Sequence, residues 1–150
     1  MDRDLPDGFK PLNTKSPFNH HVGPFFSYYR DEQLIVGLYV QSHHCNTAGI
    51  LHGGMFGVIA DVALGHNIGL ALARDAGATP EELQDGAPGA PIVTVSLTTD
   101  FIGAAREGNW LETDVEVQRA GKAMVFANVN LLCGKNRIGR ASAVFRILKR

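Results

Sequence analysis

The sequence of 150 residues has little net charge, few cysteines and only one long apolar run. A formal net charge of −1 gives no overall attraction to nucleic acid or to an anionic membrane. Cys45 and Cys133 lie far apart and show no C-x-x-C spacing, so we expect two free thiols. No secretory signal is recognisable in Met1–Lys10, and a cytoplasmic protein is therefore expected.

The histidines lack the spacing of a metal site. They occur as the adjacent pairs His20-His21 and His43-His44, and adjacent side chains point apart in an extended chain. Cys45 beside His44 is an alternative nucleophile, but catalytic pairs usually come from distant segments. We expect no metal and no cofactor.

The only long apolar run is Met55–Ala73, which raises the question of a membrane span. It contains Asp61, His66 and Asn67, and a central aspartate costs roughly 2.5–3.5 kcal/mol on insertion into a bilayer. We therefore expect a helix buried in protein and no contact with a membrane.

The remaining pattern predicts one domain over residues 24–150, preceded by an irregular arm over residues 1–23 rich in Pro, Asn and His. Glycine and proline mark a surface loop over Ala76–Pro91, with a short helical turn at Pro80–Leu83. The expected elements are a helix from about Gly53 to Arg74 and strands at Pro24–Arg30, Leu34–Gln41, Ile92–Phe101, Trp110–Arg119, Ala123–Cys133 and Arg137–Leu148.

These elements predict an α+β fold with an antiparallel sheet, since alternation is plain in the strands and the connections between the last strands are short. The helix is apolar on most of its sides, whereas a helix on a flat sheet needs one apolar stripe. We expect a sheet that curves around the helix, or a helix held between its own sheet and a partner chain.

Glycines recur every four residues along this helix, with Asp61 between Gly57 and Gly65. Glycine inside a helix costs roughly 0.5–1 kcal/mol relative to alanine, so the stripe needs a compensating reason. Either another backbone or a ligand approaches this face, or the stripe is a tight packing contact. The lone carboxylate favours the functional interpretation, because an unpaired buried charge is costly.

The helix begins at Gly53 and Gly54, where unpaired backbone N–H groups can bind a ligand oxygen. An oxyanion site one to two turns from a carboxylate would suit attack on a carbonyl carbon. Asp61 could then act as a general base on water or as the nucleophile itself.

The segment H-C-N-T-A-G-I-L-H-G-G-M-F-G-V-I-A-D-V-A-L-G, residues 44–65, resembles the hot-dog-fold thioesterases, specifically the PaaI-like acyl-CoA thioesterase family. The pattern is an Asn or Gln, then His-Gly-Gly, then an acid eight residues after the first of those glycines. The similarity continues in residues 93–108, 119–122 and 141–146. It implies a helix wrapped by a sheet of about six strands, and homodimers that pair into homotetramers with active sites between subunits.

By position, the resemblance makes Asp61 the catalytic acid and Gly53 the oxyanion N–H donor. It makes Asn46 the residue that orients the thioester or the water, with His52 shaping the turn before the helix. Thr94 matches a position that assists from the neighbouring subunit in some members. The expected substrate contacts also include Gly54 and two segments matching the coenzyme A channel, represented by Phe101, Ile102, Gly103, Arg106, Arg119, Gly121 and Lys122.

The implied activity is hydrolysis of an acyl- or aryl-acyl-CoA thioester. A non-catalytic acyl-CoA-binding module on the same fold is the alternative, although a binder gains little from a costly acid. A hydratase or dehydratase arrangement of His and acid finds no good match. One branch of the family has a hydroxyl one turn after the acid, where this chain has Gly65, so that help must come from Thr94 or be absent.

Overall fold

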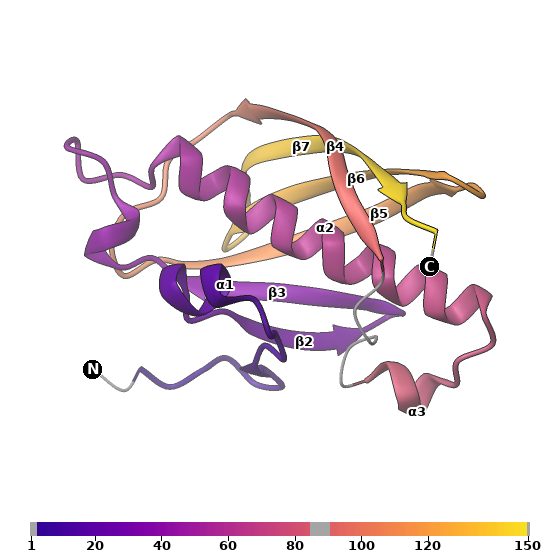
Figure 1. The fold of residues 1–150 in the computed structure, drawn as a ribbon. Coiled ribbons are helices and arrows are strands. Elements are labelled where there is room, and N and C mark those ends of the chain that lie inside the picture. Colours follow the sequence, from indigo (N-terminus) through magenta and orange to yellow (C-terminus); the bar gives the residue numbers. More distant parts are fainter. Residues whose placement is uncertain (1–2, 85–90, 150) are drawn as a thin grey trace.

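The computed structural model describes residues 3–84 and 91–149 and forms one sheet around one long helix (Figure 1). In chain order the elements are β1 (Lys10–Pro11), α1 (Pro17–Val22), β2 (Phe26–Arg30), β3 (Gln33–Tyr39), the 3-10 turn η1 (Ser42–His44), α2 (Gly53–Asp75), α3 (Pro80–Leu83), β4 (Ile92–Phe101), β5 (Trp110–Ala120), β6 (Met124–Cys133) and β7 (Asn136–Ile147).

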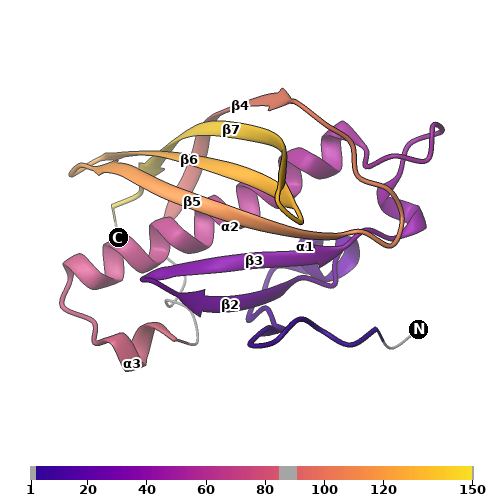
Figure 2. The same cartoon turned by 180° about the vertical axis from the view of Figure 1, so that it is seen from behind.

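The seven-stranded sheet has the order β1-β2-β3-β5-β6-β7-β4, and every neighbouring pair is antiparallel. β4 comes directly after the α2–α3 segment yet lies at the far edge, where its inner neighbour is β7 (Figure 2). A register shift between Thr94 and Ser96 interrupts this pairing. One whole edge of β4 is thus free of strand partners among the described residues, a position open to a further strand.

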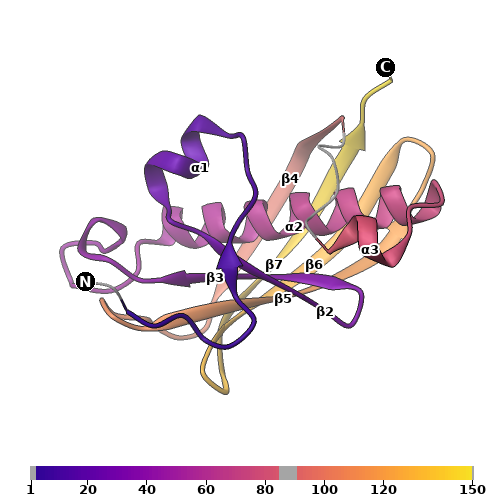
Figure 3. The same cartoon turned by 90° about the horizontal axis from the view of Figure 1, so that it is seen from below.

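The sheet curves around α2, and Figure 3 shows the helix lying along its concave side. Eleven residues of α2 are buried, among them Phe56, Ile59, Leu64 and Ile68. Length and composition alone would let α2 cross a membrane, but it is the core helix of the domain. The expectation of a helix enclosed in protein is confirmed.

The sheet does not hold α2 by apolar contact alone. Asn67 is buried, and its side chain accepts a hydrogen bond from Leu34 N and donates one to Leu34 O, both at 2.9 Å. Beside it, the Thr113 hydroxyl accepts from Val36 N at 2.9 Å. Backbone pairing of β3 with β5 covers only Gly37 to Tyr39. The Asn67 and Thr113 side chains therefore provide hydrogen-bond partners for the β3 backbone outside that stretch.

The predicted hot-dog architecture is confirmed, and each predicted strand and helix lies within a few residues of its expected bounds. The arm over residues 1–23 is less irregular than expected, because it holds α1 and the two-residue β1. β1 adds the seventh strand to a sheet expected to have about six. Ser16 caps α1 by accepting a hydrogen bond from Asn19 N at 3.2 Å. Part of the predicted loop, residues 85–90, lies outside the described residues.

Candidate active site

The start of α2 is built by His52, which is the N-cap residue. Its Nδ1 accepts a hydrogen bond from Gly54 N at 2.8 Å, and its carbonyl accepts one from Phe56 N at 3.0 Å. No described residue accepts a hydrogen bond from Gly53 N, and Gly53 is exposed. His52 therefore shapes the helix start as predicted, and it leaves the Gly53 N–H available to a ligand.

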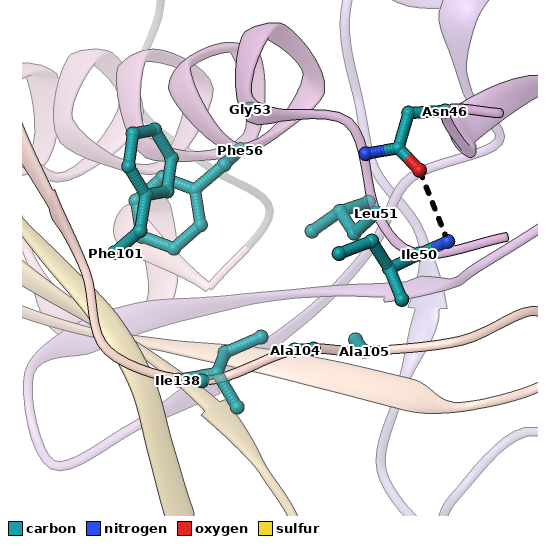
Figure 4. A pocket seen from close by; sticks show the side chains of 10 residues that line it. Asn46, Ile50, Leu51, Gly53, Phe56, Phe101, Ala104, Ala105 and Ile138 are labelled. Carbon is teal, nitrogen blue, oxygen red and sulfur yellow. Dashed lines mark hydrogen bonds between the residues drawn. The ribbon is translucent and has the colours of Figure 1, made fainter. Parts of the chain in front are cut away.

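Asn46 faces the same place from the preceding loop (Figure 4). Its Oδ1 accepts hydrogen bonds from Ala48 N at 2.9 Å and from Ile50 N at 3.4 Å. These two backbone donors identify which end of the amide is oxygen, and Nδ2 points away from them toward the helix start. Asn46 caps a turn, as its residue type allows, and also presents an N–H donor beside Gly53.

A pocket of about 190 Å³ lies between these two donors. We call it the amide pocket, and its lining residues are Asn46, Ile50, Leu51, Gly53, Phe56, Phe101, Gly103, Ala104, Ala105 and Ile138. The Phe56 and Phe101 rings meet edge to face at 5.2 Å. Phe101 is 61% exposed, although a Cβ added at Gly53 would lie only 3.2 Å from its ring. The pocket is thus apolar apart from its two N–H donors.

Phe101 and Gly103, predicted as substrate contacts, do line this pocket, and Ile102 lies exposed between them. Phe56 and Ile138 contribute further walls, and of these two sequence reasoning did not assign Ile138. Phe56 was available from the pattern as the residue three positions after Gly53. Ile138 had no signal of its own, because it reaches the pocket only through the pairing of distant strands.

Asp61 lies farther along α2 and is a half-buried residue. The Thr94 hydroxyl donates a hydrogen bond to Asp61 Oδ1 at 2.7 Å. We call these two residues the acid pair. No described residue donates to Asp61 Oδ2, so one carboxylate oxygen is held and the other is free. Thr94 and Asp61 thus meet within one chain, whereas the resemblance has Thr94 assist from the neighbouring subunit in some members.

The acid pair and the amide pocket are separate places in a single chain. Gly53 and Asp61 are eight residues apart on one helix, a distance of about 12 Å at 1.5 Å per residue. The Gly53 N–H and the Asp61 carboxylate are therefore not adjacent within one chain. The resemblance implies active sites between subunits, in which these two groups need not come from the same chain.

The three predicted phosphate contacts are also divided. Arg106 is exposed beside the amide pocket, before β5 begins, and its backbone bridges to Ile50. Arg119 is the second-last residue of β5, and Lys122 is exposed in the turn that follows, where Gly121 N donates to Met124 O at 2.9 Å. Because β5 has eleven residues, Arg106 and Arg119 are at opposite ends of the sheet.

No group of three or more His, Cys, Asp or Glu residues that could hold a metal ion occurs in the described part of the chain. Within residues 3–84 and 91–149, His66 and His44 have a displaced pKa. Burial lowers the pKa of His66 below the ordinary 6.5. Burial also lowers the pKa of His44, assisted by His43 and opposed by the backbone hydrogen bond to Val22.

Residues 48–140 match the model of the thioesterase superfamily. A Pseudomonas aeruginosa protein named "Putative esterase PA0474" is 38% identical over 145 residues, which cover 96% of this chain and 98% of the relative. Among solved structures, zebra fish thioesterase superfamily member 2 has a TM-score of 0.71 at 21% identity, covering 89% of each chain. The E. coli PaaI protein from the phenylacetic acid degradation operon has a TM-score of 0.69 at 14% identity, covering 90% of this chain and 86% of its own.

The family match and the curated relative extend over both halves of the site, from the loop before Gly53 to the strands beyond Thr94. The solved structures share the fold at lower identity, and they include PaaI-like proteins. The chain belongs to the thioesterase superfamily and adopts its hot-dog fold.

Proposed function

We propose that the protein is an acyl-CoA thioesterase, hydrolysing an acyl- or aryl-acyl-CoA to the free acid and coenzyme A. The observation that carries this proposal is the acid pair: a half-buried aspartate with one carboxylate oxygen fixed at 2.7 Å by Thr94 and the other free. A binding module would have no use for an oriented acid on a glycine-lined face. The curated relative's esterase name supports the same class of reaction.

The working site is shared between two copies of the chain. The amide pocket holds the carbonyl oxygen, and the acid pair of the second copy supplies the carboxylate. In this arrangement the oxyanion donor and the acid come from different chains, so the separation of about 12 Å between Gly53 and Asp61 along one helix no longer keeps them apart. The free edge of β4, with Val93 and Val95 exposed at 44% and 55%, supports a dimer built across this side of the molecule. Arg106 of one copy and Arg119 and Lys122 of the other would then flank one coenzyme A.

The reaction needs a proton acceptor and a place for negative charge. Asp61 takes a proton from a water molecule while the oxygen of that water forms a bond to the thioester carbon. The carbonyl oxygen then becomes an anion. The Gly53 N–H and Asn46 Nδ2 donate to that oxygen. When the C–S bond breaks, the coenzyme A sulfur receives the proton from Asp61.

In the second route, Asp61 attacks the carbonyl carbon and releases coenzyme A, forming a mixed anhydride that water hydrolyses. Turnover in ¹⁸O-water tests for the second route. Label in the Asp61 carboxylate supports the anhydride, because water can open it at the aspartyl carbon. Label in the acid product alone is expected from the general base and also from an anhydride that water opens at its acyl carbon.

The test of the proposed function is Asp61→Asn, assayed by thiol release from short-, medium-, long-chain and aryl acyl-CoAs. We expect kcat to fall by about 100-fold or more, with an unchanged melting temperature and retained substrate binding. Asp75→Asn, at the other end of the same helix, is the matched control and should behave like the wild type. Wild-type rates from Asp61→Asn would refute the mechanism, and substrate-induced stabilisation of a wild type that hydrolyses nothing would favour the binding module.

We further propose that the dimers pair into tetramers and that the protein is cytoplasmic. Both cysteines are free thiols, as expected for a reducing compartment.

A further inference from the structure

His44 is a buried imidazole that the proposed reaction does not use. It is 2% exposed, and both of its ring nitrogens are bonded to backbone groups. Gln41 N donates to Nδ1 at 3.0 Å, and Nε2 lies 2.7 Å from Val22 O. Since Nδ1 accepts, the proton is on Nε2 and is donated to the Val22 carbonyl. The ring is a neutral bridge between two chain segments.

These segments are the arm and the loop before the amide pocket. Val22 is the last residue of α1, and Gln41 opens the loop that ends at His52. The carbonyl of His44 itself accepts a hydrogen bond from His52 N at 2.9 Å. His52 in turn caps α2 through Gly54, so a continuous chain of hydrogen bonds runs from α1 to the helix start.

We propose that His44 is a positioning residue that ties α1 to the amide pocket and thereby holds His52 and the Gly53 N–H in the orientation that a carbonyl oxygen needs. This inference rests on the proposed function for the task given to Gly53. An apolar side chain would fill the same space without burying two polar ring nitrogens. The imidazole is explained by its two directed bonds.

Two substitutions divide these bonds. Gln places an amide nitrogen near the position of Nε2, so His44→Gln keeps the donor to Val22 O. Asn places an amide oxygen near Nδ1, so His44→Asn keeps only the acceptor of Gln41 N–H. We expect kcat to fall about tenfold in His44→Asn and by less than about threefold in His44→Gln, with KM unchanged in both. The exposed neighbour supplies the control, His43→Gln, which should match the wild type.

An NMR readout tests the positioning without any enzyme activity. The amide resonances of Gly53 and Gly54 and the His52 Nδ1 shift should move in His44→Asn and stay near their wild-type positions in His44→Gln. These shifts would support the inference even if the protein hydrolysed no thioester. Absence of hydrolysis would refute the proposed function and leave the positioning role of His44 standing. Resonances that stay unchanged in both variants would overturn the inference, as would an equal loss of kcat in both.

If His44→Asn does not fold, Ser16→Ala takes its place, because it loosens α1 at its far end by removing the N-cap. The same three resonances should then move. A folded Ser16→Ala whose Gly53, Gly54 and His52 signals are unchanged would overturn the coupling of the arm to the pocket.

Discussion

Single residues of the candidate site use one polar end to fix themselves and leave the other end for chemistry. Asn46 binds backbone through Oδ1 and presents Nδ2, and His52 caps the helix through Nδ1. Asp61 is held at Oδ1 by Thr94 and keeps Oδ2 free. Each group is oriented before a substrate arrives, which lowers the cost of organising the transition state.

Thr94 can be tested by removing its hydroxyl while keeping its shape. Thr94→Val should lower kcat about tenfold, because the loss of one orienting hydrogen bond costs about 1.4 kcal/mol. Thr94→Ser retains the donor and should stay within about threefold of the wild type. Thr94 is exposed, so neither change should alter the melting temperature. Equal rates for Thr94→Val and the wild type would contradict the prediction, because Asp61 would then need no orienting partner.

The lowered pKa values of His44 and His66 predict a stability that depends on pH. Both folded-state pKa values lie below 6.5, so the unfolded chain binds protons first as the pH falls. The melting temperature should be highest above pH 6.5 and should decline as the pH drops from there toward the folded-state values. His66→Gln should show a shallower decline between pH 7.5 and pH 5 in calorimetry, and a slope identical to that of the wild type would contradict the prediction.

At the scale of elements, the glycine stripe of α2 acquires a physical reason. A Cβ added at Gly57 or at Gly65 would meet no atom within 4 Å in this chain. Packing within the monomer therefore does not require glycine there, and a tight packing contact at these two positions would have to be made with another chain. We infer that the second copy approaches this face, beside Asp61.

Gly65→Ala separates helix propensity from dimer contact. In an isolated chain it should stabilise the helix by roughly 0.5–1 kcal/mol. With a second copy packed against the stripe, the added methyl group should raise the dimer dissociation constant about tenfold or more, as measured by analytical ultracentrifugation. A dimer as tight as the wild type would place the interface elsewhere. Ala71→Gly, on the same helix, gives the propensity change in the opposite direction.

The elements themselves were largely predictable because periodicity is local. Alternation located β4 at Ile92–Phe101, and turn residues located α3 at Pro80–Leu83. The arm was not predictable in the same way. α1 has no buried residue, and β1 is two residues long, so neither carries a hydrophobic pattern. Their places depend on tertiary bonds such as those of His44, which no spacing reveals.

The candidate site was predictable by residue type but not by distance. Asn46, Gly53 and Asp61 follow a recognisable spacing, and each presents the expected group. Sequence separation places Gly53 and Asp61 about 12 Å apart along one helix, but it does not show which chain's acid faces the Gly53 N–H. The same limit applied to Thr94, since pairing across the sheet, and not proximity in sequence, brings its hydroxyl to Asp61.

At the scale of the whole molecule, the proposed dimer would take two half-sites from each chain, the amide pocket for the carbonyl oxygen and the acid pair for the water. An assembly with twofold symmetry would place the amide pocket of each copy against the acid pair of the other and create two equal sites. Substitutions in different half-sites would then be complementary. This property belongs to the shared site alone, because a site within one chain cannot be restored by another inactive chain.

Mixing two inactive variants tests this arrangement. Asp61→Asn lacks the acid, and Asn46→Ala lacks the carbonyl donor, so each alone should be nearly inactive. After unfolding and refolding together in equal amounts, half of the dimers are mixed, and each mixed dimer has one intact and one doubly defective site. We expect about a quarter of the wild-type rate per chain, provided that the dimers form at random. A rate equal to the mean of the two separate variants would refute the shared site, because it would require each site to lie within a single chain. The acid of one chain would then have to serve an oxyanion donor about 12 Å away along the same helix.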